Sequence, residues 1–149
     1  MHVKPLDKPK WSLTAPSDVA VFLRNISIIL PRGSRLVIEG NDITQEVCAF
    51  LEANQPASCP HVQVGTVWPK PRQFHLAADP DKLGELAALA DRFALPEVFD
   101  HLKAYWKGHE VLVWYDATAK DPVHVAQEIE EEKLREFCQV VGCDFREIA

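Results

Sequence analysis

The densest group of side chains that could do chemistry lies in residues 100–116, which read DHLKAYWKGHEVLVWYD. Two histidines, two tyrosines and two tryptophans fall within this stretch. Imidazole groups can ligate a metal ion or exchange protons near neutral pH. Whether these groups can act together depends on which of them share one face of the structure.

The stretch has the pattern of a β-hairpin with its turn at Lys107-Gly108. Glycine readily adopts the positive φ that a two-residue turn requires. Residues opposite each other across a hairpin share a face, and neighbours along a strand alternate. One predicted face collects core-type residues: Leu102, Ala104, Trp106, Val111, Val113 and Tyr115. The other face is polar and aromatic: His101, Lys103, Tyr105, Glu110, Leu112 and Trp114.

The polar-aromatic face resembles the surfaces that proteins use to bind other proteins, because Trp and Tyr are enriched in such interfaces. We therefore expect a binding surface with Tyr105 and Trp114 as anchors, flanked by His101, Lys103 and Glu110. Alternatively, the largely apolar helix expected at residues 18–30 covers this face and buries Trp114.

A second hypothesis is a metal site on the same face. In QFHLA (73–77) and PVHVAQ (122–127), alternation points His75 and His124 away from the core. If these strands join the hairpin in one sheet, His75, His101 and His124 share one side of it. Three histidines can hold a zinc ion and leave a fourth position for water. That arrangement would suit a metal-binding protein or a metal-dependent hydrolase, although no His-x-His or His-Glu-x-x-His spacing supports it.

Two loops carry weaker signals. Cys59-Pro60-His61 places a thiol near an imidazole, which could activate it as a nucleophile, but no orienting acid is identifiable. WPKPR (68–72) is stiffened by two prolines and presents Trp68, so it could bind a partner at low entropic cost. Alternatively, Trp68 packs onto the protein and the prolines protect a sheet edge.

Hydrophobic periodicity, caps and turn residues define the elements that must position these groups. Helices are expected at residues 18–30, 42–53, 80–93 and 130–141. Strands are expected at 35–39, 61–67, 73–77, 101–106, 109–114 and 122–127. Residues 35–106 then have the β-α-β-β-α-β order of a ferredoxin-like unit, extended by two strands and flanking helices. We predict an α+β fold with a largely antiparallel sheet and helices mainly on one face.

Composition narrows the class of protein. The 149 residues suit one domain, expected at 15–149 after an extended or flexible arm at 1–14. A formal charge of −6 disfavours nucleic acid as a partner. The sequence has no apolar run that could span a membrane, and its four cysteines suit reduced thiols in the cytoplasm. The leading hypothesis is a cytoplasmic, non-enzymatic protein without a cofactor that binds another protein.

Overall fold

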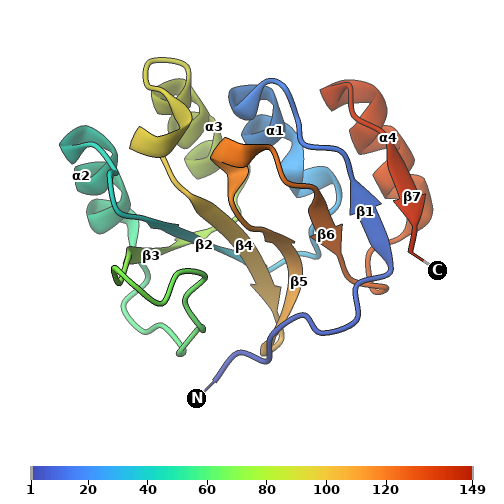
Figure 1. Cartoon of the computed structure of the whole chain (residues 1–149), viewed down its shortest axis with the longest axis horizontal. Helices are drawn as coiled ribbons and strands as arrows, with labels where there is room; N and C mark the ends of the chain where they lie inside the picture. Colours follow the sequence, from blue (N-terminus) through green and yellow to red (C-terminus); the bar gives the residue numbers. More distant parts are fainter. Residues whose placement is uncertain (1, 149) are drawn as a thin grey trace.

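A seven-stranded antiparallel sheet forms the centre of the protein in a computed structural model that describes residues 2–148 (Figure 1). The strands are β1 (Trp11–Leu13), β2 (Arg35–Gly40), β3 (Arg72–Ala77), β4 (His101–Trp106), β5 (His109–Trp114), β6 (Val123–Val125) and β7 (Phe145–Glu147). Their order across the sheet is β3-β2-β4-β5-β6-β1-β7, and all neighbouring pairs are antiparallel. The predicted α+β class and antiparallel sheet are confirmed.

The helices lie together on one side of this sheet, which we call the helix face (Figure 1). They are α1 (Val19–Asn25), α2 (Gln45–Asn54), α3 (Pro80–Ala90) and α4 (Glu131–Val141). Helix α3 begins as predicted, with the Asp79 carboxylate accepting bonds from two backbone amides and proline in the first turn. Helix α4 ends at Gly142, whose φ of 80° is easily reached only by glycine.

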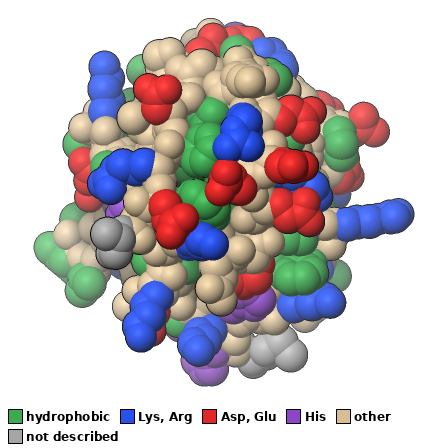
Figure 2. Space-filling model, turned by 90° about the vertical axis from the view of Figure 1, so that its right-hand side faces the viewer, with side chains coloured by type: hydrophobic (Ala, Val, Ile, Leu, Met, Phe, Trp, Pro, Cys, Tyr) green, Lys and Arg blue, Asp and Glu red, His purple; other side chains and the backbone are tan. Residues whose placement is uncertain are grey.

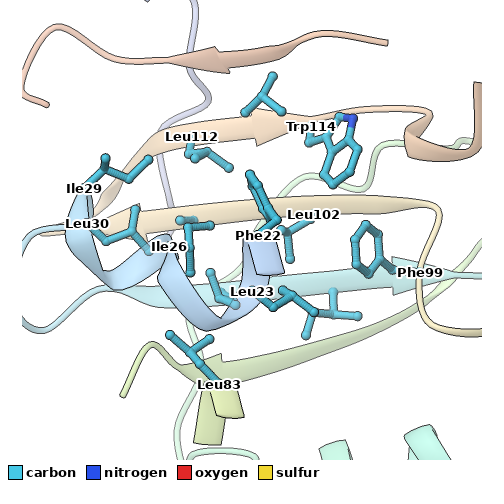
Figure 3. Packing of buried hydrophobic residues seen from close by; sticks show 14 of the residues in the cluster. Phe22, Leu23, Ile26, Ile29, Leu30, Leu83, Phe99, Leu102, Leu112 and Trp114 are labelled. Atoms are coloured by element: carbon cyan, nitrogen blue, oxygen red, sulfur yellow. The ribbon is translucent and has the colours of Figure 1, made fainter. Parts of the chain in front are cut away.

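The core fills the space between the helices and the helix face (Figure 3). In Figure 3, Phe22 and Leu23 of α1, and Ile26 just after it, point towards side chains that rise from the strands. The Phe22 ring lies 5.2 Å from the Trp114 ring, and Phe99 lies 5.7 Å from it on another side, measured between centroids. Trp114 is therefore a central core residue, and burial of its large ring contributes strongly to stability.

A β-bulge explains why Trp114 is in the core rather than on the predicted binding face. The turn at Lys107-Gly108 forms as predicted, and Tyr105 pairs with Glu110. Beyond that pair the register shifts by one residue, so Val111 has no partner in the ladder. Every later residue of β5 therefore changes face.

The bulge corrects four of the predicted face assignments. Leu112 pairs with Ala104 and Trp114 with Leu102, so both belong to the helix face. Val113 pairs with Lys103 and lies on the opposite side. Tyr115, which we assigned to the core, is 40% exposed.

The ferredoxin-like order is not confirmed, because residues 61–67 do not form the expected strand. Their alternating valines reflect a different contact: Val62 is buried against Val37 and Tyr105 on the side of the sheet away from the helices. Residues 55–71, which we call the cover loop, leave α2, cross that side and return to begin β3. This route makes β3 antiparallel to its neighbour β2.

The N-terminal residues contribute to the sheet, although we expected an extended or flexible arm at 1–14. Trp11 and Leu13 are buried, and β1 pairs with both β6 and β7. A three-residue strand is too short to show alternation, so neither β1 nor β7 was predicted. Residues 2–8, which we call the arm, run across the side of the sheet opposite the helices, which we call the second face (Figure 1).

Candidate functional site

The second face of the sheet, opposite the helices, is covered by the arm and the cover loop. The arm is bonded to both neighbours: the Val3 amide donates to the His61 carbonyl at 2.8 Å, and the Lys4 amide donates to the Gly108 carbonyl at 2.8 Å. The Glu110 amide donates back to the Lys4 carbonyl at 2.9 Å. The polar-aromatic face is therefore closed by two segments that lie far from it in the sequence.

Three charged side chains form a buried charge cluster beneath this cover: Glu39, Lys103 and Glu110. The Lys103 Nζ lies 3.4 Å from Glu39 Oε2 and 3.9 Å from Glu110 Oε2. The side chains of Lys103, Glu39 and Glu110 are 1%, 0% and 2% exposed. Lys103 also donates to the Gln63 carbonyl in the cover loop. Burial of a charge is tolerated only when it is paired and hydrogen-bonded, as it is here.

The two carboxylates also bind the cover itself. Glu39 accepts from the Gly65 amide at 2.8 Å and from Gln73 Nε2 at 2.7 Å. Glu110 accepts from the Leu6 amide of the arm at 2.9 Å. Two carboxylates share one ammonium group, and burial raises the pKa of Glu110 above its ordinary value. The buried charge cluster thus holds the arm and the cover loop to the sheet.

His75 and Tyr105 form a neutral hydrogen-bonded pair beside the cluster. His75 Nδ1 lies 2.9 Å from the Tyr105 hydroxyl, and the two rings meet edge to face. Burial lowers the pKa of His75 and raises that of Tyr105, so both groups favour their uncharged forms. The pair accounts for two of the polar groups on this face.

His101 has hydrogen-bond partners at both ring nitrogens. The Asp116 amide donates to Nδ1 at 2.9 Å, so Nε2 carries the proton and donates to Thr66 Oγ1 at 2.6 Å. The Tyr115 ring packs on the imidazole, with centroids 5.6 Å apart. His101 therefore orients the cover loop, and neither nitrogen is free for a metal ion.

The three predicted zinc ligands lie on one face of the sheet, as the alternation of side chains along the strands predicts, but they do not converge. His75 and His124 lie in one row across the sheet, with Val37, Lys103 and Val113 between them. Four strand spacings separate the two histidines by roughly 19 Å. Across residues 2–148, no group of three or more His, Cys, Asp or Glu side chains could hold a metal ion. The predicted His75, His101 and His124 zinc site is therefore wrong.

Most of the predicted protein-binding residues are buried. The covered residues are His101, Lys103, Tyr105 and Glu110. Trp114 lies in the core under α1, which is the alternative raised from the apolar helix at 18–30. Trp68 alone among the six is exposed, at 86%.

The Cys59 thiol, which His61 could have activated, has no imidazole partner among residues 2–148. The Cys59 Sγ is exposed and donates to the Pro56 carbonyl at 3.6 Å. His61 instead directs its Nδ1 at His2 Nδ1, 3.1 Å away. Sequence reasoning missed this histidine pair, since the residues are 59 positions apart and no local pattern joins them. It also missed Glu39, although this acid directly follows the apolar run Leu36–Ile38 of β2.

The exposed part of the cover loop is an apolar tip with a basic flank. Val67 and Trp68 are 87% and 86% exposed. Lys70 and Arg72 are the only charged residues between positions 53 and 78. Arg72 is paired with Glu52 at 2.6 Å and fixes one end of the tip.

A different surface provides a contrast. The side formed by β1, β7 and α4 shows acidic and basic side chains interspersed around a small apolar area (Figure 2). A surface that mixes both signs of charge favours solubility, and it creates no strong electrostatic potential of one sign that would attract a charged partner.

Comparisons of the chain with models of known protein families, with curated proteins and with solved structures find no match. Within residues 2–148, no helix is both long enough and apolar enough to cross a bilayer.

Proposed function

We propose that the protein is a non-enzymatic binding protein that inserts Trp68 into an apolar pocket of another protein. The observation that carries this proposal is the 87% and 86% exposure of the adjacent Val67 and Trp68. A tryptophan side chain that becomes buried removes 150–250 Å² from water, a gross gain of roughly 4–6 kcal/mol. Tryptophan is also among the residues most enriched at the energetic centres of interfaces.

The tip is held at both ends, so little conformational freedom is lost on binding. On one side, the Gly65 amide donates to Glu39 and Thr66 bonds to His101. On the other side, Arg72 is paired with Glu52. Pro69 and Pro71 restrict the backbone between these points. A loop of this kind is organised for binding before its partner arrives.

The charge of the tip identifies the chemistry of the partner. Lys70 lies two residues after Trp68 and supplies the uncompensated positive charge of the tip, whereas Arg72 is already paired with Glu52. An apolar pocket with an acidic rim complements this arrangement. The formal charge of −6 for the whole chain opposes the approach of nucleic acid, which we exclude as a partner.

This proposal gives the buried charge cluster a positioning role. Glu39 binds the cover loop at Gly65, two residues before the exposed Val67. Lys103 binds the same loop at Gln63. The cluster thus orients the tip without contacting the partner. We further propose a cytoplasmic location, because a chain of 149 residues can bury a sufficient core without disulfides and its four cysteines suit reduced thiols.

The test combines identification of the partner with a matched binding measurement. A photoreactive residue at position 67, beside the intact Trp68, would cross-link the partner in a lysate, and the purified partner would then be titrated with Trp68→Ala and with Val140→Ala. Val140 is the control because it is 51% exposed on α4. Loss of a central tryptophan should weaken binding about 30-fold, the equivalent of ~2 kcal/mol, whereas Val140→Ala should bind as the wild type does.

Lys70→Glu provides an independent check on the acidic rim. This variant should weaken binding most at low salt, where surface charges are least screened. Equal affinities for Trp68→Ala and Val140→Ala would overturn the proposal. Sedimentation equilibrium that shows a dimer of this chain, abolished by Trp68→Ala, would overturn it as well, since the occupant would then be a second copy.

A further inference from the structure

A pair of histidines joins the arm to the cover loop at the surface. His2 Nδ1 and His61 Nδ1 lie 3.1 Å apart, and both side chains are exposed. The rings meet edge to face, with centroids 4.8 Å apart and planes at 71°. We propose that His2 and His61 form a bidentate site for a divalent transition-metal ion such as Zn²⁺ or Cu²⁺.

The spacing of the two nitrogens suits a shared ion. Metal–nitrogen bonds to histidine are about 2.0–2.1 Å long, so nitrogens 3.1 Å apart would subtend roughly 100° at the metal. This angle lies between the values for square-planar and tetrahedral coordination, the geometries that Cu²⁺ and Zn²⁺ prefer. To hold an ion, both rings must turn so that their Nδ1 lone pairs point at it, and their exposed position leaves room for this rotation.

The backbone holds the pair in register. Residues 2 and 61 form a parallel bridge, and the Val3 amide donates to the His61 carbonyl at 2.8 Å. Beneath them Val3 and Val62 are buried together with Val37. The ligands are therefore organised by an apolar contact that does not depend on the metal.

When a metal ion replaces the proton shared by the two rings, the pair neither gains nor loses a proton overall. Without metal, one ring donates its Nδ1 proton to the Nδ1 lone pair of the other. With metal, both Nδ1 atoms supply lone pairs, and the displaced proton moves to Nε2 of the same ring. Both imidazoles stay neutral, and no net proton is released.

The remaining coordination positions would be filled by water. Within residues 2–148, no third His, Cys, Asp or Glu completes the group. The pair borders an open hollow of about 340 Å³ that is also lined by Lys4, Pro5 and Gln63. A site with two protein ligands would bind metal exchangeably, and it would reject Mg²⁺, which prefers oxygen ligands.

A bound ion would fasten the arm over the buried charge cluster. The arm contributes the Leu6 amide to Glu110, so its release would open one side of that cluster. Any ligand that binds only the closed form shifts the equilibrium towards closure. Metal binding should therefore slow hydrogen exchange at Val3 and Leu6.

The test is calorimetric titration of the tag-free chain with ZnCl₂, followed by NMR hydrogen exchange. One ion should bind per chain, more tightly for Cu²⁺ than for Zn²⁺ and not at all for Mg²⁺. His2→Gln and His61→Gln should each weaken zinc binding at least tenfold. His124→Gln is the control, because this half-exposed histidine on β6 takes no part in the pair. Both tested side chains are exposed, and the metal-free melting temperatures of the variants should match that of the wild type.

Other outcomes would overturn the site. Unchanged affinity in both variants would place the ion elsewhere, for example at the His109–Glu128 pair. Loss of binding in His2→Gln alone would indicate chelation by the start of the chain without His61. If His61→Gln were to unfold, wild-type NMR spectra would still decide, since zinc must shift the ring signals of both histidines.

Discussion

Replacement of Lys103 by methionine is the most direct test of the buried charge cluster. Methionine retains most of the length of the lysine side chain but removes the one ammonium group of residues 2–148 that lies within 4 Å of both carboxylates. It also leaves the Gln63 carbonyl without its donor. Two carboxylates would then face each other in a site that is almost closed to water.

The expected effect is large on the scale of protein stability. Removal of one partner from a buried ion pair costs about 3–5 kcal/mol, a substantial part of the roughly 5–15 kcal/mol that stabilises a typical protein. For a chain of this size it corresponds to a fall in melting temperature of roughly 6–20 °C. The cost should shrink as the pH falls from 8 to 5, because protonation of a carboxyl removes the uncompensated charge.

Urea unfolding at pH 8 and at pH 5 measures both the cost and its pH dependence. The double variant Lys103→Met/Glu110→Gln should recover part of the loss at pH 8, since one of the unpaired charges is gone. A cost below about 1 kcal/mol at pH 8, or an equal cost at both pH values, would refute the assignment of Lys103 as the counter-ion of a buried pair.

Four further outcomes follow from the burial of individual groups. Because burial raises the pKa of Glu110, this group contributes stability that is present below its unfolded pKa and lost as pH rises through its folded pKa; in urea unfolding, Glu110→Gln should therefore flatten the decline of stability as pH rises above the ordinary pKa of a glutamate. Trp68→Phe should change stability by less than about 0.5 kcal/mol, as surface substitutions do, yet remove most of the iodide-quenchable tryptophan fluorescence, the remainder coming from the partly exposed Trp106. Trp114→Ala should cost about 3–5 kcal/mol in the same unfolding assay. Cys59 should react first with a thiol reagent, and mass spectrometry that finds another cysteine labelled before it would contradict its exposed position.

The secondary structure was largely predictable because each correct element had a local signal. Asp79-Pro80 marked the start of α3, Gly142 marked the end of α4, and Lys107-Gly108 marked the hairpin turn. Caps and turns act over a few residues, so they can be recognised without knowledge of the tertiary structure. The α+β class followed from these elements.

The candidate site was less predictable because it depends on two long-range events. Parity placed His101, Lys103 and Tyr105 on the correct face, but the cover formed by the arm and residues 55–71 has no local signature. The bulge at Val111 then moved Trp114 to the opposite side. The position of a bulge depends on how both strands pair and how the core packs. The alternation of residues within a single strand therefore does not reveal it.

The cover has a consequence for the order in which the protein folds. Leu6 binds Glu110 across 104 positions, and Lys103 binds the Gln63 carbonyl across 40, whereas the hairpin of β4 and β5 closes over a two-residue turn. Contacts between distant residues form slowly, because the intervening chain must first be ordered. The hairpin of β4 and β5 therefore forms before the arm and the cover loop close over the charges. Local opening of these surface segments brings the charges into contact with water without unfolding of the core.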